Sequence, residues 1–301
     1  MSAAKPKAAP LDRCRALRAL ARAARDYSAH DALPRELAAR LIDSLDYYQG
    51  QPERVLDVGC GVGRDGRALR KRWPRASVMA LDLSPAMLRE TRRHAGWRRP
   101  LLPVRADALA LPYADRSIDI VFSNLCLPWC GAPKPFLKEL NRVLKPGGFM
   151  VASTLGPDTL KELRGAWISA DPGGSHVDGF IDMHDIGDAA LAAGLKDPVL
   201  DTDHLALDYA TPRDLLLDLR GAGVINADPA CARGLTGKAR FRAMLDAYPR
   251  RSDGRIQASF EVVTLHAWGA PTDFLPRYGG RETPFEVVQW AERAPRPHRQ
   301  R

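Results

Sequence analysis

The sequence has little of what would place it in a membrane, in a disulfide-bonded class or in a metal-binding class. No apolar run approaches the roughly 18 residues that a membrane helix needs. The 5 cysteines are an odd and scattered set without a CxxC pair, which disfavours both a disulfide framework and a zinc site. We therefore expect a reduced, cytoplasmic protein with neither a bound metal nor a membrane partner.

Acidic residues are also in the minority. The chain has 45 Lys and Arg against 36 Asp and Glu, and its net charge of +9 favours an acidic partner. Aromatic residues do not alternate with the arginines as a platform for single-stranded nucleic acid requires, so we expect no nucleic-acid partner. Residues 1–25 are basic and resemble a transit peptide superficially, but they are poor in serine. We interpret residues 1–10 as a disordered start, and a targeting role for residues 1–25 stays open.

Strand and helix patterns alternate from residue 32 to residue 154. Apolar strands are predicted at 54–58, 77–82, 101–105, 118–123 and 149–154, and helices at 32–49, 64–72, 85–94 and 133–143. Such an alternation predicts the α/β class and a parallel, doubly wound, Rossmann-like sheet.

The pattern becomes irregular after Gly156. Helices are predicted at 157–168, 183–194 and in two pieces within 212–248, and strands at 198–209 and 260–268. We expect a helical cap inserted in this half of the chain. The predicted organisation is an N-terminal helical segment 1–50, a cofactor-binding core 51–156, a cap with the last strands 157–270 and a polar tail 271–301.

A glycine-rich loop after the first strand is the strongest chemical signal. The sequence from Val55 reads VLDVGCGVG, so that Asp57 is followed by Gly59, Gly61 and Gly63. Glycine is needed where a Cβ would keep the backbone from a ligand and where φ is positive. Residues 61–66 also fit the dinucleotide pattern GxGxxG, which alone is a weak signal. The first glycine at the strand end is Gly59, and this placement favours the loop that binds S-adenosylmethionine (SAM), with Asp57 facing its methionine end.

Polar side chains at the ends of the following strands complete a cofactor site. Asp82, with Leu83 beside it, lies 19 residues after Gly63, the spacing expected of an acid that binds ribose hydroxyls. Asp107 and Ala108 follow the third strand, where an acid accepts from the adenine amino group and its neighbours cover the ring. Asn124 ends the fourth strand, where the sulfonium and methyl would lie. Open α/β sheets bind ligands at these strand ends.

These motifs resemble the malonyl-acyl-carrier-protein O-methyltransferases of biotin synthesis. The resemblance runs from about Tyr27 to Trp268, and it includes features shared by the whole methyltransferase superfamily: VLDVGCGVG, ALDLSPAML and RVLKPGG. More particular features are Ser123-Asn124-Leu125 with Trp129, STLGPDTLKELR from Ser153, DMHDIGD from Asp182, GLTG from Gly234 with Tyr248, and FEVV from Phe260 with HAWG from His266. The sequence departs from the family at Arg25-Asp26-Tyr27 and at Pro128, which bears on the contacts at the site entrance.

The resemblance implies that the protein methylates the free carboxylate of malonyl-acyl-carrier protein, with SAM as cofactor, to start the pimeloyl moiety of biotin. A carboxylate is already ionised at neutral pH, and no Ser-His-Asp set or carboxylate pair is evident, so positioning and exclusion of water would be the protein's task. Tyr27, Trp129 and His184 are the candidate residues near the acceptor. For each of them a structural role, as a cofactor seal, as apolar packing or as a helix cap, is also open.

Other functions remain open at this point. A C-methyltransferase of quinone synthesis shares the general motifs, and a mitochondrial assembly factor that hydroxylates a protein subunit shares some of the particular ones. A dehydrogenase would require the GxGxxG interpretation. The preference for malonyl-acyl-carrier protein over malonyl-CoA and the oligomeric state are not encoded in any pattern that we can read.

Overall fold

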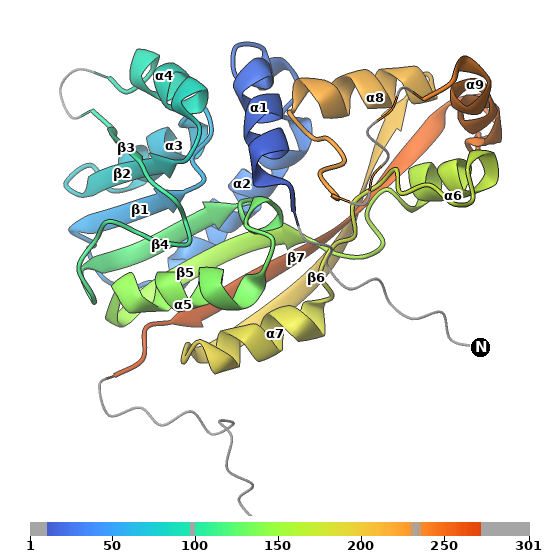
Figure 1. The fold of residues 1–301 in the computed structure, drawn as a ribbon. Coiled ribbons are helices and arrows are strands. Elements are labelled where there is room, and N and C mark those ends of the chain that lie inside the picture. The colour runs from blue at the N-terminus through green and yellow to red at the C-terminus, as the bar shows by residue number, and fades with distance from the viewer. Residues whose placement is uncertain (1–10, 97–99, 230, 232–233, 235, 272–301) are drawn as a thin grey trace, which may run out of the picture.

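The computed structural model describes residues 11–96, 100–229, 231, 234 and 236–271 (Figure 1). The predicted disordered start and nearly all of the predicted polar tail lie outside these residues. No helix within them has both the length and the apolar character that crossing a membrane would require.

One seven-stranded sheet organises the described chain, with the strand order β3-β2-β1-β4-β5-β7-β6. The strands are β1 Arg54–Val58, β2 Ser77–Asp82, β3 Leu102–Arg105, β4 Ile118–Asn124, β5 Leu144–Leu155, β6 Lys196–Tyr209 and β7 Ile256–Trp268. β1 to β5 are parallel, as predicted, whereas β7 pairs antiparallel with both β5 and β6. The sheet is therefore mixed, and the α/β class and the Rossmann-like core are confirmed.

The antiparallel pair forms an arm that extends beyond the parallel strands. Leu155, the last residue of β5, is opposite Val262 of β7. Residues 256–261 of β7 pair only with β6, where Tyr209 is opposite Ile256. At about 3.3 Å per residue, the arm extends roughly 20 Å past the end of β5. Because β6 runs in the same direction as β5, Tyr209 lies on the side of the sheet at which the parallel strands end.

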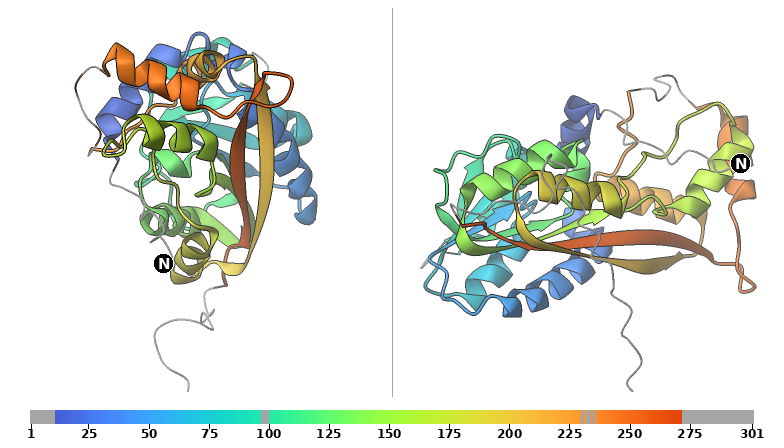
Figure 2. Two further views of the ribbon diagram at one scale, coloured as in Figure 1. Left: turned by 90° about the vertical axis from the view of Figure 1, so that its right-hand side faces the viewer. Right: turned by 90° about the horizontal axis from the view of Figure 1, so that it is seen from below.

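Helices cover both faces of the sheet. Viewed from below in Figure 2, α2 and α3 lie on one face and α5 and α7 on the other. The helices are α1 Arg13–Ala23, α2 Ala32–Ser44, α3 Arg64–Arg72, α4 Pro85–Arg93, α5 Pro133–Val143, α6 Lys161–Ala170, α7 Met183–Ala192, α8 Pro212–Gly221 and α9 Lys238–Ala247, with short 3₁₀ turns η1 Tyr27–Ala29, η2 Leu45–Tyr47 and η3 Leu127–Trp129.

The two-residue period of the strands divides the core between these faces. In β1, Val55 packs with α2 and α3, whereas Leu56 packs with α5 and α7. Both side chains are fully buried. Parallel strands that are covered on both faces have this continuous apolar character, which explains why they could be located in the sequence.

Most helix boundaries follow local signals. Ser84 caps α4 by accepting from the backbone N–H of Met87, and Pro85 occupies the first turn. Gly194 follows α7 with φ +82°, the left-handed conformation predicted for a residue after a helix end.

The start of α6 is a correction. The sequence predicts a helix from residue 157, but α6 begins at Lys161. The backbone N–H of Asp158 donates to Glu261, and the N–H of Leu160 donates to the Ser259 carbonyl oxygen. Asp158 and Leu160 therefore satisfy their backbone donors on β7 rather than in a helix, and Leu160 takes a left-handed φ of +55°.

A separate hydrophobic cluster lies on the arm. It joins α6, α8 and α9 to the far ends of β6 and β7 and contains Trp167, Leu215, Met244 and Phe260. Figure 1 shows these helices gathered beyond the parallel strands. These helices all come from the part of the chain, 157–270, in which a helical cap is predicted. The predicted domain limits stay a prediction.

Candidate active site

A long pocket lies at the side of the sheet where the parallel strands end. Its walls come from α1, residues 27–34, the segments after β1 to β5, the end of β6 and α8. At one end it is lined by Asp107 and Ala108 after β3, and at the other by Leu207 and Tyr209 of β6. We call these the β3 end and the arm end. Since β3 and β6 are the two edge strands of the sheet, the pocket crosses its full width.

The glycine-rich loop approaches the pocket with bare backbone. Gly59 and Gly61 line the pocket and have φ values of +76° and +52°. A Cβ on Gly59 would lie 2.7 Å from the Cys126 side chain, whereas a Cβ on Gly61 would meet no protein atom within 4 Å. The space in front of Gly61 is therefore left for a ligand.

Gly63 has a different role from the one predicted. It does not line the pocket, and a Cβ there would lie 2.7 Å from Thr91 of α4. Its φ of +74° opens α3 and lets α4 approach closely. Gly66 likewise packs against Asp57 and Leu101 rather than facing the pocket. The GxGxxG interpretation, which requires this set of glycines to receive a pyrophosphate, gains no support.

Asp82 lines the pocket and organises the loop. Its Oδ2 accepts from Gly61 N at 3.0 Å, and its Oδ1 accepts from Ser84 N at 2.7 Å. Burial raises the pKa of Asp82 to about 6, although these backbone donors oppose the shift. A carboxylate has about four lone-pair sites, so further acceptor capacity remains for a ribose diol. Leu83, beside it, also lines the pocket.

Asp57 lies beneath the loop rather than in the pocket wall. It is 1% exposed and does not line the pocket, which corrects the expectation of a direct cofactor contact. Its Oδ2 is buried without a hydrogen-bond partner among the described residues. Burial, followed by the charges of Asp65 and Asp82, raises the pKa of Asp57 well above its ordinary value. These three carboxyl groups make the loop a favourable place for positive charge.

Asp107 is held at the β3 end. Its Oδ1 accepts from Arg13 Nη2 at 2.8 Å and from Leu109 N at 2.9 Å. The hydrogen bond from Arg13 keeps the pKa of Asp107 below its usual range. Oδ2 accepts no hydrogen bond from the described residues, which leaves it available to an adenine amino group. Ala108 lines the pocket next to it.

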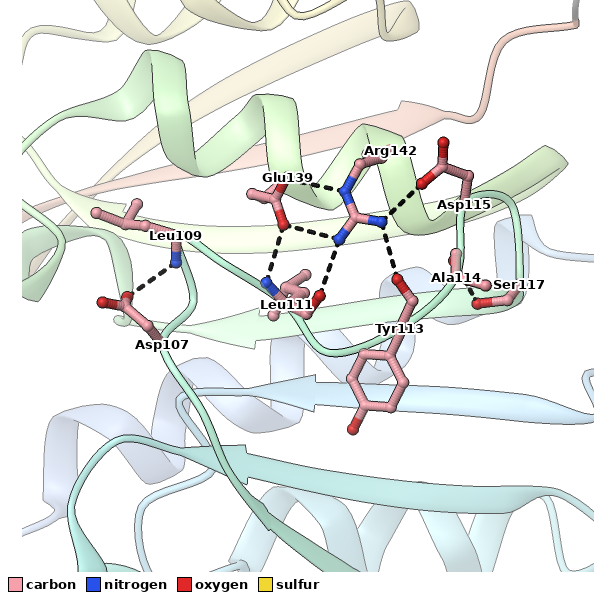
Figure 3. A network of polar contacts seen from close by, with 9 residues as sticks. All are labelled: Asp107, Leu109, Leu111, Tyr113, Ala114, Asp115, Ser117, Glu139 and Arg142. Atoms are coloured by element: carbon pink, nitrogen blue, oxygen red, sulfur yellow. Dashed lines mark hydrogen bonds and ion pairs between the residues drawn. The ribbon is translucent and has the colours of Figure 1, made fainter.

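A partly buried polar network fixes the loop that carries Asp107 (Figure 3). Arg142 of α5 donates to the carbonyl oxygens of Leu111 and Tyr113 and pairs with Glu139 and Asp115. Glu139 in turn accepts from Leu111 N at 2.9 Å. Side chains of α5 therefore bind the loop backbone at Leu111 and Tyr113. These contacts hold the segment that carries Asp107 and Ala108.

Asn124 lines the pocket, but its amide is already engaged. Nδ2 donates to the Pro34 carbonyl oxygen at 2.8 Å and to Asp65 at 3.0 Å, and Oδ1 accepts from Ser153. The side chain thus ties the end of β4 to α2, α3 and β5. Leu125 follows with φ +55°, a strained conformation for leucine, and presents itself to the pocket.

Two of the three candidate acceptor residues line the pocket. Tyr27 is half-buried, and burial followed by the charge of Asp65 raises the pKa of its hydroxyl to about 12. It therefore remains a neutral hydrogen-bond donor. Trp129 lies in η3 beside Cys126 and Cys130, which also line the pocket.

His184 is a correction. Its side chain is 79% exposed and does not line the pocket. Its Nδ1 lies 2.7 Å from Asp182, which caps α7 through the backbone N–H of His184. The residue serves the helix end, and the structure gives it no place near an acceptor.

A polar cluster at the arm end was not predicted from the sequence. His30, Tyr209 and Asp218 line the pocket, and Asp218 hydrogen-bonds to both of the others. His30 follows η1, whereas Tyr209 and Asp218 belong to β6 and α8; the residues lie up to 188 positions apart, so no local pattern identifies them. Arg13 was also missed, because one arginine in the basic segment 1–25 carries no signal that distinguishes it from the others.

The residues present fit SAM. Bare backbone at Gly61, spare acceptor capacity on Asp82 and Asp107, and the carboxyl groups around the loop match a ligand with a ribose, an adenine and a positively charged sulfonium. The pocket is consistent with most of the predicted cofactor contacts, which stay predictions. The residues concerned are Gly59, Gly61, Asp82, Leu83, Asp107, Ala108 and Asn124.

Comparisons with known proteins agree with this geometry. Residues 56–152 match the family described as methyltransferase domain. The chain is 43% identical to a malonyl-[acyl-carrier protein] O-methyltransferase of Gallionella capsiferriformans, over 83% of this chain and 88% of that protein. It is 45% identical to a protein of the same name from Halorhodospira halophila, over 86% and 88%.

A similar fold is found in the YcgJ protein of Bacillus subtilis. The TM-score is 0.53 and the identity 15%, over 77% of this chain and 98% of that one. At this identity the likeness concerns the fold alone.

Proposed function

The chain belongs to the malonyl-[acyl-carrier protein] O-methyltransferase family, and we propose that it converts the free carboxylate of malonyl-acyl-carrier protein to a methyl ester. It is a methyltransferase that uses SAM. The product would start the pimeloyl moiety of biotin, because esterification removes a charge that would otherwise prevent extension as an ordinary acyl chain.

The extent of the similarity is the observation that carries the proposal. The methyltransferase domain match ends at residue 152, whereas the relatives align over 83% to 86% of the chain. The similarity therefore reaches beyond the shared cofactor core into the second half of the chain. That half supplies the arm end of the pocket, where an acceptor rather than a cofactor would bind.

The polar chemistry of the pocket suits an acceptor that needs no activation. A carboxylic acid with an ordinary pKa near 4 is ionised at neutral pH, so no general base has to remove a proton. Tyr27, with its raised pKa, donates a hydrogen bond and does not act as a base. The task that remains is to orient the acceptor and to exclude water.

SAM, when bound, supplies the electrophilic methyl group. Gly59 and Gly61 would admit it through bare backbone, Asp82 would bind its ribose hydroxyls, and Asp107 would accept from its adenine. The carboxyl groups of Asp57 and Asp65 favour positive charge beside the loop. Trp129 and Leu125 cover that part of the pocket with apolar surface.

Acyl-carrier protein fits the charge of the chain as the second partner. The net charge is +9, and α1, which forms one wall of the pocket, exposes Arg18 and Arg22. Arg25 is exposed just beyond its end. A strongly acidic carrier would be attracted to this side of the molecule, and its rate of association would fall as salt is added.

Methyl transfer from labelled SAM tests the proposal directly. The protein is incubated with malonyl-acyl-carrier protein, and acetyl-acyl-carrier protein serves as the control that lacks only the free carboxylate. A base-labile methyl ester on the malonyl form alone is the expected result. Tight SAM binding without transfer to either form would reject the proposed acceptor and return the quinone and assembly-factor functions to consideration.

A further inference from the structure

The pocket contains a polar cluster, formed by His30, Asp218 and Tyr209, that the cofactor does not account for. His30 Nδ1 lies 2.8 Å from Asp218 Oδ1, and the Tyr209 hydroxyl donates to Asp218 Oδ2 at 2.8 Å. Their neighbours in the wall at the arm end include Leu33, Leu207 and Leu219. A polar cluster in such a wall is costly to desolvate unless its groups bind one another or a ligand.

The hydrogen bonds fix the orientation of the imidazole. An ionised carboxylate only accepts, so the proton between His30 and Asp218 belongs to Nδ1. Nε2 then has no hydrogen-bond partner among the described residues. Gly221 of α8 contributes to this arrangement, because a Cβ at that position would lie within 2.5 Å of three ring atoms, Nε2 included. A larger residue would displace the ring.

The segment that carries His30 connects the elements around the cofactor loop to the arm. His30 belongs to the segment 27–34, whose residues after His30 are tied to elements around the cofactor loop. Asp31 forms an ion pair with Arg64 at the start of α3, and the Pro34 carbonyl oxygen accepts from Asn124. Through Asp218, His30 connects that same segment to α8 on the arm.

Cationic groups are scarce in this pocket. Among the described residues that line it, only Arg13 and His30 have side chains that can carry positive charge. Arg13 is engaged by Asp107 at the β3 end. An anionic acceptor that enters from the arm end therefore meets a single side chain able to offer it a charge-assisted hydrogen bond.

We propose that His30, as the imidazolium with a proton on each ring nitrogen, binds the free carboxylate of the acceptor through Nε2–H, and that Asp218 and Tyr209 are positioning residues that orient the ring. The inference rests on the proposed function and adds the acceptor subsite to it. One carboxylate oxygen bonded to His30 leaves the other oxygen as the nucleophile. Selection of a malonyl over an acetyl group would follow from the same contact.

Two substitutions of His30 separate the two ring nitrogens. His30→Asn keeps an amide group near the position of Nδ1, and His30→Gln keeps one near the position of Nε2. If Nε2 binds the acceptor, Gln retains more acceptor binding than Asn. If the ring only links the segment to Asp218, Asn is the better substitute.

The measurement is binding of malonyl- and acetyl-acyl-carrier protein to the protein saturated with S-adenosylhomocysteine, followed by steady-state kinetics with SAM. We expect His30→Asn to weaken malonyl binding and to lower kcat/KM by about 10- to 100-fold, the effect of losing one hydrogen bond to a charged group. Acetyl binding and the Kd of SAM should stay within about twofold of wild type.

His184→Asn is the matched control, since His184 has the same Nδ1 hydrogen bond to an aspartate but lies outside the pocket. It should change none of these values. Gly221→Ala should reproduce the loss of malonyl binding without altering His30 itself, whereas Gly165→Ala, in a helical site with no atom within 4 Å, should not.

The outcomes distinguish the inference from the function on which it rests. If the wild-type protein transfers a methyl group to the malonyl form and His30→Asn binds malonyl-acyl-carrier protein as tightly as wild type, the inference is overturned and the proposed function is not. Better recovery with Asn than with Gln would also overturn it and assign His30 a structural role. A wild-type protein that neither prefers malonyl to acetyl nor transfers a methyl group would overturn both.

Discussion

Replacing Gly61 with alanine separates the stability of the glycine-rich loop from its ability to admit a cofactor. The residue has φ +52° and lines the pocket, and a Cβ on it would touch no protein atom within 4 Å. The substitution therefore destabilises the fold only through backbone strain. It weakens SAM binding through the added methyl group, which would project into the space left for the ligand.

The two effects differ in magnitude. A left-handed conformation costs an alanine roughly 1–2 kcal/mol, which lowers the Tm of a chain of this size by about 2–8 °C. A methyl group in the path of the cofactor should weaken SAM binding by at least about 100-fold, or ~2.7 kcal/mol. Gly147→Ala is the matched control, because Gly147 has φ +72°, no atom within 4 Å of its Cβ and no place in the pocket wall.

Thermal unfolding and isothermal titration with SAM measure these two quantities on the same samples. We expect both alanine variants to lose similar stability and only Gly61→Ala to lose SAM binding. A Gly61→Ala protein that binds SAM within twofold of wild type would refute the assignment of this loop to the cofactor. A large loss of SAM binding in Gly147→Ala would show that strain alone disables the site.

Acidification should weaken SAM binding through Asp82, whose pKa is raised to about 6 by burial. The effect on folding has the opposite sign: because the pKa is raised in the folded state, the contribution of Asp82 to stability is present at low pH and is lost as the pH rises through about 6. SAM favours the ionised form; we expect its Kd to rise about tenfold from pH 7 to pH 5 by calorimetry, and an equal rise in Asp82→Asn would contradict this. Arg142→Ala should cost about 2 kcal/mol by leaving two loop carbonyl oxygens without their donor, seen as a Tm lower by ~4–8 °C together with weaker SAM binding. The exposed pair of Arg93 provides the comparison, since Arg93→Ala should change the Tm by less than about 2 °C, and equal effects of the two variants would count against the loop scaffold. Asp57→Asn replaces a carboxyl group whose ionisation is opposed by burial and by neighbouring carboxyl groups, so a higher Tm with weaker SAM binding is expected, and a lower Tm would mean that the ionised carboxylate stabilises the loop.

Local signals in the sequence were sufficient for the cofactor core. The strands at 54–58 and 77–82 and the helices at 64–72 and 133–143 have the predicted bounds, because buried parallel strands and capped amphipathic helices leave patterns within a few residues. The glycines of the loop and Asp82 could be found for the same reason. Their chemistry depends on backbone conformation and on their position at a strand end, and both are readable from neighbouring residues.

Interactions between distant segments could not be predicted from the sequence. The helix predicted from residue 157 begins at Lys161 because the backbone donors of Asp158 and Leu160 bond to β7, about 100 positions away. His184 was selected from a motif, and only the structure shows that it faces solvent. Asp57 was placed against the cofactor from its spacing, yet packing buries it beneath the loop.

The sequence by itself therefore determined that this chain has a methyltransferase core, where its glycine-rich loop lies and which acids follow the strands, since each depends on residues close together in the chain. The tertiary structure alone decided the antiparallel β6–β7 arm, the extent of the pocket across the sheet and the meeting of His30 with Asp218 and Tyr209. The physical reason is that strand pairing and side-chain contacts over 188 positions arise from packing of the whole chain, which no short window of residues encodes.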